Sequence, residues 1–424
     1  MSTPLHPRSR LGARIILGVA LLFHLSMLLS WRLGFYHGLT FDSTATHGRR
    51  GWDFYALYQA GRNVRTGISI YQSDNDKIEV VVPYYTPYRY LPFLAYTLGL
   101  LLNTLSPLWA LRLWVLLVEV VLLLCARLSW RLGRDSIRRA LLAAMWLVYT
   151  PYYLEIYLGQ FSLVQAGLVL GILRGAMQAA GDPTARRGLT GLCWTMSLLW
   201  KQNTALFVPL WLRLRRWRTL ALGGGAVLLT TLPYFLRHPS SWAAFAANLW
   251  GNAPGHQLGN LGMRQFLLSL GSALFPSLSP EAHLWLGRAW ALAILAIALW
   301  ATWSDPSPDE ALHLCLWMTT YFLIYHHVWE HHYVMLLPVF VVLYRRTNSR
   351  WVLLLYALIA IWTPYGLIDP QGMAAYHMPM RWTPLQPRLL DVLYHASKAL
   401  PTLALWGYLL WRIRGARFAP RGMT

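Results

Sequence analysis

The chain has 424 residues, of which 56% are hydrophobic and 12% are charged, and it contains 23 tryptophans. This composition excludes an ordinary soluble domain, because apolar runs long enough to cross a bilayer recur from end to end. The formal net charge is +21, but the basic residues stand in short clusters between the apolar runs. Such clusters are typical of cytoplasmic loops, so we expect membrane lipids, and no nucleic acid, to be the partners of this charge. The sequence predicts an all-α polytopic membrane protein.

The first apolar run covers residues 11–31, and its N-terminal end has three arginines, Arg8, Arg10 and Arg14. It lacks a small-residue cleavage site, so we interpret it as a retained first span whose N-terminal end is cytoplasmic. Residues 32–90 would then form an outer loop.

One stretch of this loop, residues 51–71, is too polar to cross a bilayer. Phe54, Leu57 and Tyr58 recur in it at helical spacing, and Gly67 follows the pattern. We predict a short amphipathic helix at the membrane interface, with Asp53 in its first turn. The helix dipole alone favours an acid there, so Asp53 is either a general base or a helix-start acid.

Residues 91–236 are predicted to form the core helices of a single membrane domain. Two apolar runs, 91–105 and 109–126, precede a basic cluster. Either the first of them is re-entrant or both form one long bent helix. The run 189–212 has basic loops at both ends and Lys201 near its middle. A re-entrant pair fits this pattern, whereas a single crossing would reverse the topology downstream.

The remainder of the domain is expected to comprise a second outer loop, C-terminal helices and a cytoplasmic tail, at 237–283, 284–411 and 412–424. This topology places Asp53, Gln160 and the histidine-rich segment 326–332 on the outer face, and Lys201 could approach that face from a re-entrant apex. We therefore expect a site that is open to lipid and to the outer compartment.

The histidine-rich segment contains His326, His327, Glu330, His331 and His332. Histidines four residues apart share a helix face, so a metal site is one interpretation. The glutamate, however, stands outside the usual His-Glu-x-x-His order. Contact with a phosphate or sugar and anchoring at the interface are the alternatives.

Lys201 is an ionisable group in an apolar run, which costs roughly 3 kcal/mol on membrane-insertion scales and therefore indicates a function. Phosphate binding, pairing with Glu119 or Glu155, and snorkelling are the open interpretations. An arginine fork suits a phosphate, although lipid head groups are equally suitable partners. Three arginines near the outer interface fit this description: Arg62, Arg65 and Arg264.

Several kinds of site have no signature in the sequence. No glycine-rich phosphate loop, nucleotide fingerprint, serine elbow or Cys/His metal spacing is present, and the three cysteines lie inside apolar runs. An enzyme working in the outer compartment would need a donor carried in the membrane, such as a polyprenyl phosphate.

Several short motifs, in order, resemble those of glycosyltransferase family 87. The first is Asp53-Phe54 followed by Tyr58, Gly67 and Tyr71. The later ones are Tyr88, Tyr90 and Pro92, then Gly159-Gln160, then the run 188–201 before an arginine-rich loop at 213–218, and finally Trp329-Glu330-His331-His332 with Pro338. The resemblance covers roughly residues 11–344.

The resemblance implies a GT-C-type fold of about 10–13 transmembrane or re-entrant helices. It also implies inverting transfer of mannose from a polyprenyl-phosphate donor to a glycolipid or lipid-linked acceptor, in the cell membrane, with both termini cytoplasmic and the site extracytoplasmic. Asp53 would be the catalytic base, and no cofactor or metal is required. The other implied residues are His331, His332, Lys201, Arg62 and Gln160 for the donor, and Tyr58, Tyr71 and Glu330 in support.

The chain departs from the family pattern at three places: Phe93 replaces a second proline, Ser162 replaces an asparagine, and Gln202 to Thr204 replace a segment that often has proline. These departures concern the sugar and acceptor rather than the fold. Two other function classes remain open. A flippase for lipid-linked sugars should show paired broken helices in two halves, which the sequence lacks. A non-catalytic envelope-assembly protein would not need Asp53.

Overall fold

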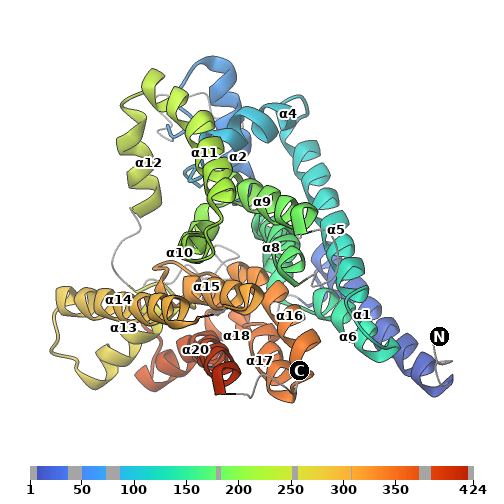
Figure 1. Cartoon of the computed structure of the whole chain (residues 1–424). Helices are drawn as coiled ribbons and strands as arrows, with labels where there is room; N and C mark the ends of the chain where they lie inside the picture. The colour runs from blue at the N-terminus through green and yellow to red at the C-terminus, as the bar shows by residue number, and fades with distance from the viewer. Residues whose placement is uncertain are drawn as a thin grey trace.

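The computed structural model describes residues 7–36, 50–72, 86–177, 183–250, 256–306, 308–371 and 383–418. Within these ranges the chain is helical and its only extended pairing is an isolated bridge between Asn260 and Trp329. The predicted all-α class is therefore confirmed (Figure 1). The acidic residues 74, 76 and 79 of the first outer loop lie outside the described residues.

Four helices are long and apolar enough to cross a membrane: α1 (Pro7–Leu33), α5 (Pro107–Trp130), α11 (Trp217–Arg237) and α14 (Pro280–Ser304). Between 17% and 33% of the residues in their apolar windows are buried inside the protein. The remaining apolar side chains face outward, as lipid-facing helices require. These helices make the chain a polytopic membrane protein.

The remaining helices are shorter, except α20, which has 31 residues. In chain order they are α2 (Trp52–Thr66), α3 (Pro92–Leu94), η1 (Ala95–Gly99), α4 (Leu100–Leu102), α6 (Ser136–Leu147), α7 (Pro151–Leu158), α8 (Ser162–Met177), α9 (Pro183–Trp200), η2 (Gln202–Phe207), α10 (Val208–Arg213), α12 (Ser241–Trp250), α13 (Met263–Leu274), α15 (Glu310–Ile324), η3 (Glu330–Leu336), α16 (Leu337–Thr347), α17 (Arg350–Ala360), α18 (Tyr365–Ile368) and α20 (Arg388–Phe418).

The predicted helix of the first outer loop is α2. It begins one residue before Asp53 and ends at Thr66, and the C-cap residue Gly67 has a φ of 72°, the left-handed conformation that glycine adopts without strain. Its buried face is wider than the predicted stripe and includes Gly61, where an added Cβ would lie 2.3 Å from the Gly99 carbonyl oxygen. Close packing on η1 therefore fixes the helix that carries Asp53.

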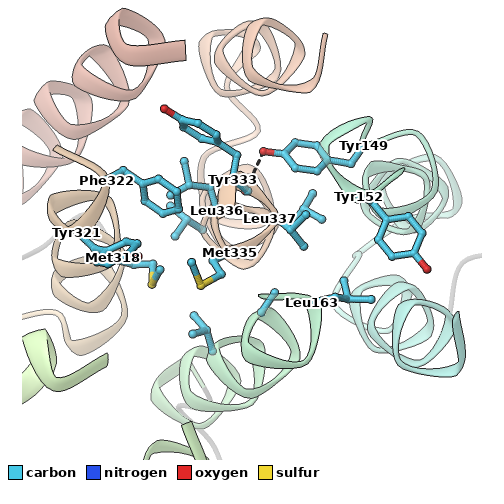
Figure 2. Packing of buried hydrophobic residues seen from close by; sticks show 14 of the residues in the cluster. Tyr149, Tyr152, Leu163, Met318, Tyr321, Phe322, Tyr333, Met335, Leu336 and Leu337 are labelled. Carbon is cyan, nitrogen blue, oxygen red and sulfur yellow. Dashed lines mark hydrogen bonds between the residues drawn. The ribbon is translucent and has the colours of Figure 1, made fainter. Parts of the chain in front are cut away.

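The histidine-rich segment enters the centre of the core. Figure 2 shows Tyr333, Met335, Leu336 and Leu337 of η3 and α16 surrounded by side chains from neighbouring helices. The Tyr149 hydroxyl donates to the Tyr333 carbonyl at 2.9 Å. Every residue of η3 is buried, so its backbone position is set by packing on all sides.

The predicted cytoplasmic segments lie together at one end of the fold. Arg216 pairs with Glu310 at 2.6 Å and Arg346 pairs with Asp309 at 2.5 Å. The guanidinium of Arg213 donates to the Asp305 carbonyl at 2.6 Å. From Glu330 to Thr347 the chain runs through the 7 residues of η3 and the 11 residues of α16. The summed rise of these two helices is roughly 30 Å, about the thickness of a bilayer core.

Candidate active site

A cavity of about 800 Å³ lies among α2, the turn after α7, the turn after α9, and η3. Five of the nine predicted site residues line it: Asp53, Gln160, Lys201, His331 and His332. They come from four separate segments of the chain. A cavity of this volume is large enough for a sugar phosphate together with part of an acceptor.

Two neutral donors hold the carboxylate of Asp53. Gln160 Nε2 donates to Asp53 Oδ2 at 2.6 Å, and the Thr86 hydroxyl donates to Asp53 Oδ1 at 2.7 Å. Gln160 Oε1 accepts from the Tyr90 hydroxyl and the Phe161 amide, both at 3.3 Å. These contacts orient the carboxylate, while each oxygen keeps a lone pair for a further donor.

Gly159 brings Gln160 to this position. Its φ is 63°, and an added Cβ would lie 2.6 Å from the Cβ of Phe54. A side chain at 159 would therefore push the end of α7 away from α2 and separate Gln160 from Asp53.

Lys201 stands between α9 and η2, where the chain folds back on itself. The fold-back is closed by Trp194 Nε1, which donates to the Thr204 carbonyl at 2.9 Å. Lys201 Nζ donates to the Ser162 hydroxyl at 2.7 Å, and both Glu155 and Asp53 attract its charge. Glu155 is fully buried and accepts from the Leu163 amide at 2.8 Å. The ammonium therefore neutralises a buried acid and also faces the cavity.

The two adjacent histidines of η3 have different surroundings. His332 Nδ1 accepts from the Trp329 amide at 3.0 Å, which caps the start of η3. Neither ring nitrogen of His331 has a hydrogen-bond partner among the described residues, although the side chain is buried and lines the cavity. His331 is thus the ring whose two nitrogens make no hydrogen bond within the described protein, whereas His332 has a structural bond.

Arg89 was not predicted from the sequence. It stands between Tyr88 and Tyr90 in the chain, and its side chain lines the cavity. Its charge acts on the loop before η3. Burial first, then Arg89, lowers the pKa of His327 to about 3, and burial with Arg264 and Arg89 lowers the pKa of His326 to about 4. His327 Nε2 accepts a bond of 2.6 Å from the Trp329 indole, which also requires a neutral ring. Among the described residues, Arg89 and Lys201 are the arginine and lysine side chains of the cavity wall.

The residues predicted to support the site lie behind the wall of the cavity. The Tyr58 hydroxyl donates to the Leu105 carbonyl at 2.7 Å and the Tyr71 hydroxyl to the Tyr90 carbonyl at 2.9 Å. Glu330 accepts from the Thr363 amide at 3.2 Å and lies 3.6 Å from Lys398 Nζ. Arg62 is not among the described residues that line the cavity.

Comparisons with known proteins bear on the family of this chain. The model for glycosyltransferase family 87 matches residues 88–325, more than half of the chain. Two crystal structures of ArnT from Cupriavidus metallidurans are distantly similar: one bound to undecaprenyl phosphate, with 16% identity and a TM-score of 0.35, and one in the apo state, with 17% and 0.36. Each likeness covers 94% of this chain and 78% of the other. No curated protein matches the sequence. On the family match, this membrane protein belongs to glycosyltransferase family 87.

Proposed function

We propose that the chain transfers mannose from a polyprenyl-phosphate donor to a glycolipid or lipid-linked acceptor at the outer face of the cell membrane. The observation that carries this proposal is the placement of an oriented carboxylate, Asp53, in the same cavity as two cations and the unpartnered ring of His331. A base for the acceptor and cations for a leaving phosphate are the two requirements of such a transfer.

In the proposed reaction, Asp53 accepts the proton of an acceptor hydroxyl. The oxygen attacks the anomeric carbon from the side opposite the phosphate, and the bonding electrons leave with the phosphate oxygen. Lys201 and Arg89 stabilise the charge that develops there, and a ring nitrogen of His331 donates or accepts at the phosphate or sugar. A single displacement inverts the anomeric configuration.

The proposed reaction needs no divalent metal. The leaving group is a monophosphate, and two basic side chains, Arg89 and Lys201, line the described part of the cavity. A metal that neutralises a nucleotide diphosphate therefore has no counterpart in this mechanism.

Membrane topology supports an outer site. The basic segments around Arg216 and Arg346 are expected to be cytoplasmic, and they lie at the far end of η3 and α16 from His331. The cavity would then open on the opposite side, where no nucleotide sugars are present and a lipid-linked donor is required.

The test is an assay of the purified protein with polyprenyl-phosphate-mannose and a membrane lipid extract. A new mannolipid formed by the wild type but not by Asp53→Asn supports the proposal. Transfer from a nucleotide sugar instead would contradict the donor assignment. Movement of a lipid-linked sugar across vesicles, equal in the wild type and Asp53→Asn and without a new product, would favour a flippase.

A further inference from the structure

A second group of titratable side chains lies outside the mechanism, where α20 meets the loop 256–262. His256, Asp391 and His395 each offer one ligand atom there, and these atoms all lie within 4.8 Å of one another. Asp391 and His395 are four residues apart on one face of α20, whereas His256 is more than a hundred residues away in sequence. That separation explains why no spacing motif revealed the group.

One ring nitrogen of this group, His395 Nε2, has a lone pair and, among the described residues, no hydrogen-bond donor that can reach it. His395 Nδ1 lies 2.9 Å from the carbonyl oxygen of Asn260, which can only accept. His395 Nδ1 therefore carries the proton of the neutral ring, and its Nε2 has a lone pair. That Nε2 lies 3.3 Å from His256 Nε2 and 3.7 Å from Asp391 Oδ1.

The ring nitrogen of His256 cannot satisfy both neighbours. Its Nε2 lies 3.0 Å and 3.2 Å from the two oxygens of Asp391, so a proton on this nitrogen points at the carboxylate. The lone pair of His395 is then left facing a nitrogen and a carboxylate, in a side chain with no solvent exposure. With the proton of His256 on Nδ1 instead, a cation among the three atoms would use the lone pairs of both Nε2 atoms and of the carboxylate at once.

The distances match those expected around a tetrahedral zinc ion. Zn–N bonds of about 2.0–2.1 Å at a tetrahedral angle place two ligand nitrogens about 3.3 Å apart. The two ring nitrogens are 3.3 Å apart, and the carboxylate lies 3.0 Å and 3.7 Å from them. Two imidazoles and one carboxylate suit zinc better than magnesium or calcium, which prefer oxygen ligands.

We propose that His256, Asp391 and His395 bind a structural Zn²⁺ that fastens the loop 256–262 to α20, with water as the fourth ligand. The surrounding contacts show what this ion would stabilise. The Tyr394 hydroxyl donates to the Leu258 carbonyl at 2.9 Å, and Asn260 Oδ1 accepts from the Val328 amide at 3.0 Å.

The loop therefore links α20 to the segment that precedes η3. Gln257, which follows His256, is itself part of the cavity wall. A metal at this place would hold the cavity in shape without contacting the reacting atoms.

The experiment uses the full chain in detergent, purified with an affinity tag that contains no histidine. The protein is stripped with a chelator, then titrated with Zn²⁺ and, separately, with Co²⁺. We expect one Zn²⁺ per chain, a visible absorption band of tetrahedral Co²⁺, and a rise in the unfolding temperature on rebinding. Loss of a group that is hydrogen-bonded to a metal ligand lowers metal affinity by roughly 10–100-fold. Asp391→Asn and His395→Gln remove a ligand itself, so they should weaken zinc binding by more than this.

His313→Gln is the matched control. His313 is also fully buried, its Nδ1 donates to the Asp309 carbonyl at 2.9 Å and its Nε2 lies 3.7 Å from Asp305, but it has no third ligand group among the described residues. This variant should bind zinc as the wild type does. Failure of the stripped wild type to bind zinc, or equal binding by His395→Gln and the wild type, would overturn the proposal and leave a metal-free hydrogen-bonded cluster. Because the readouts are metal content, absorption and unfolding, this result is independent of whether the sugar donor has been identified correctly.

Discussion

Gln160 Nε2 donates a hydrogen bond of 2.6 Å to Asp53 Oδ2, and so joins the end of α7 to the first turn of α2. The direction of this bond is fixed, because Gln160 Oε1 already accepts from Tyr90 and Phe161. Thr86 holds the other oxygen of Asp53. An acid that only starts a helix needs no donors to fix its orientation. A base that takes the proton of an acceptor hydroxyl must be held in one geometry, and these hydrogen bonds hold it.

Asp53→Asn should fold normally and lose transfer. Asparagine can place its oxygen against Gln160 and its amide against the Thr86 hydroxyl, which rotates to accept, so both bonds survive. Only the proton acceptor is lost, and transfer should fall by roughly 10²–10⁴-fold. The measurement is the initial rate of product formation beside the unfolding temperature.

Glu119→Gln is the control for this substitution. Glu119 is a partly buried acid that bonds the Tyr152 hydroxyl at 2.8 Å and His24 at 3.2 Å, and it does not line the cavity. Turnover by Glu119→Gln should stay near that of the wild type. A well-folded Asp53→Asn enzyme with full activity would refute the proposed base.

The two adjacent histidines should respond differently to substitution. His331→Ala removes a ring whose nitrogens have no bond within the described protein, so we expect a large loss of transfer and little loss of stability. His332→Ala removes the acceptor of the Trp329 amide, so it should lower the unfolding temperature and reduce transfer less. Donor KM, kcat and the unfolding temperature, measured for both variants, distinguish these roles. The reverse pattern would assign the ligand contact to His332.

The sequence was sufficient for the helical class and for five residues of the cavity, because apolar runs and short motifs are local signals. It could not show that Gln160 bonds Asp53, since that contact depends on the left-handed turn at Gly159 and on the packing of α7 on α2. Arg89 was missed for a similar reason. The sequence alone does not distinguish one loop arginine from another, and only the fold shows that Arg89 lines the cavity.

Lys201→Met should raise the donor KM and lower kcat. A hydrogen bond to a charged group contributes about 1.5–3 kcal/mol, so a loss of roughly 10–100-fold in kcat/KM is expected. Lys201→Arg, which keeps the charge, should retain part of the activity. Ser162→Ala removes the 2.7 Å bond that positions the ammonium and the hydroxyl bond to Glu155, but it keeps the charge of Lys201 and should have a smaller effect.

Lys201→Met also leaves Glu155 buried without its cation, which should lower stability. Adding Glu155→Gln removes the stranded charge, so the double variant should regain stability without regaining activity. If activity returned with stability, the effect of Lys201 on transfer would be structural only.

Acid should destabilise the loop before η3. The pKa values of His326 and His327 are lowered to about 4 and about 3, mainly by burial. Below pH 6.5 the unfolded chain binds protons that the folded protein does not, so stability is complete above about pH 6.5 and falls as the pH drops toward 4. The unfolding temperature of His327→Gln, whose amide oxygen can still accept from the Trp329 indole, should fall less steeply over this range. Identical slopes for both proteins would contradict the assignment.

The topology can be tested with single cysteines at exposed positions. Cys125, Cys193 and Cys315 are first replaced by alanine, because Cys193 is only partly buried. Cysteines at Thr66 and Ser240, both exposed, should react with an impermeant reagent added outside the cell. Cysteines at the exposed positions Arg134 and Arg218 should react only after the membrane is opened, because basic clusters stay in the cytoplasm. Position 66 lies on α2, the helix that carries Asp53. Labelling of this position only from the cytoplasm would place the cavity beside the pool of nucleotide sugars and remove the reason for a lipid-linked donor.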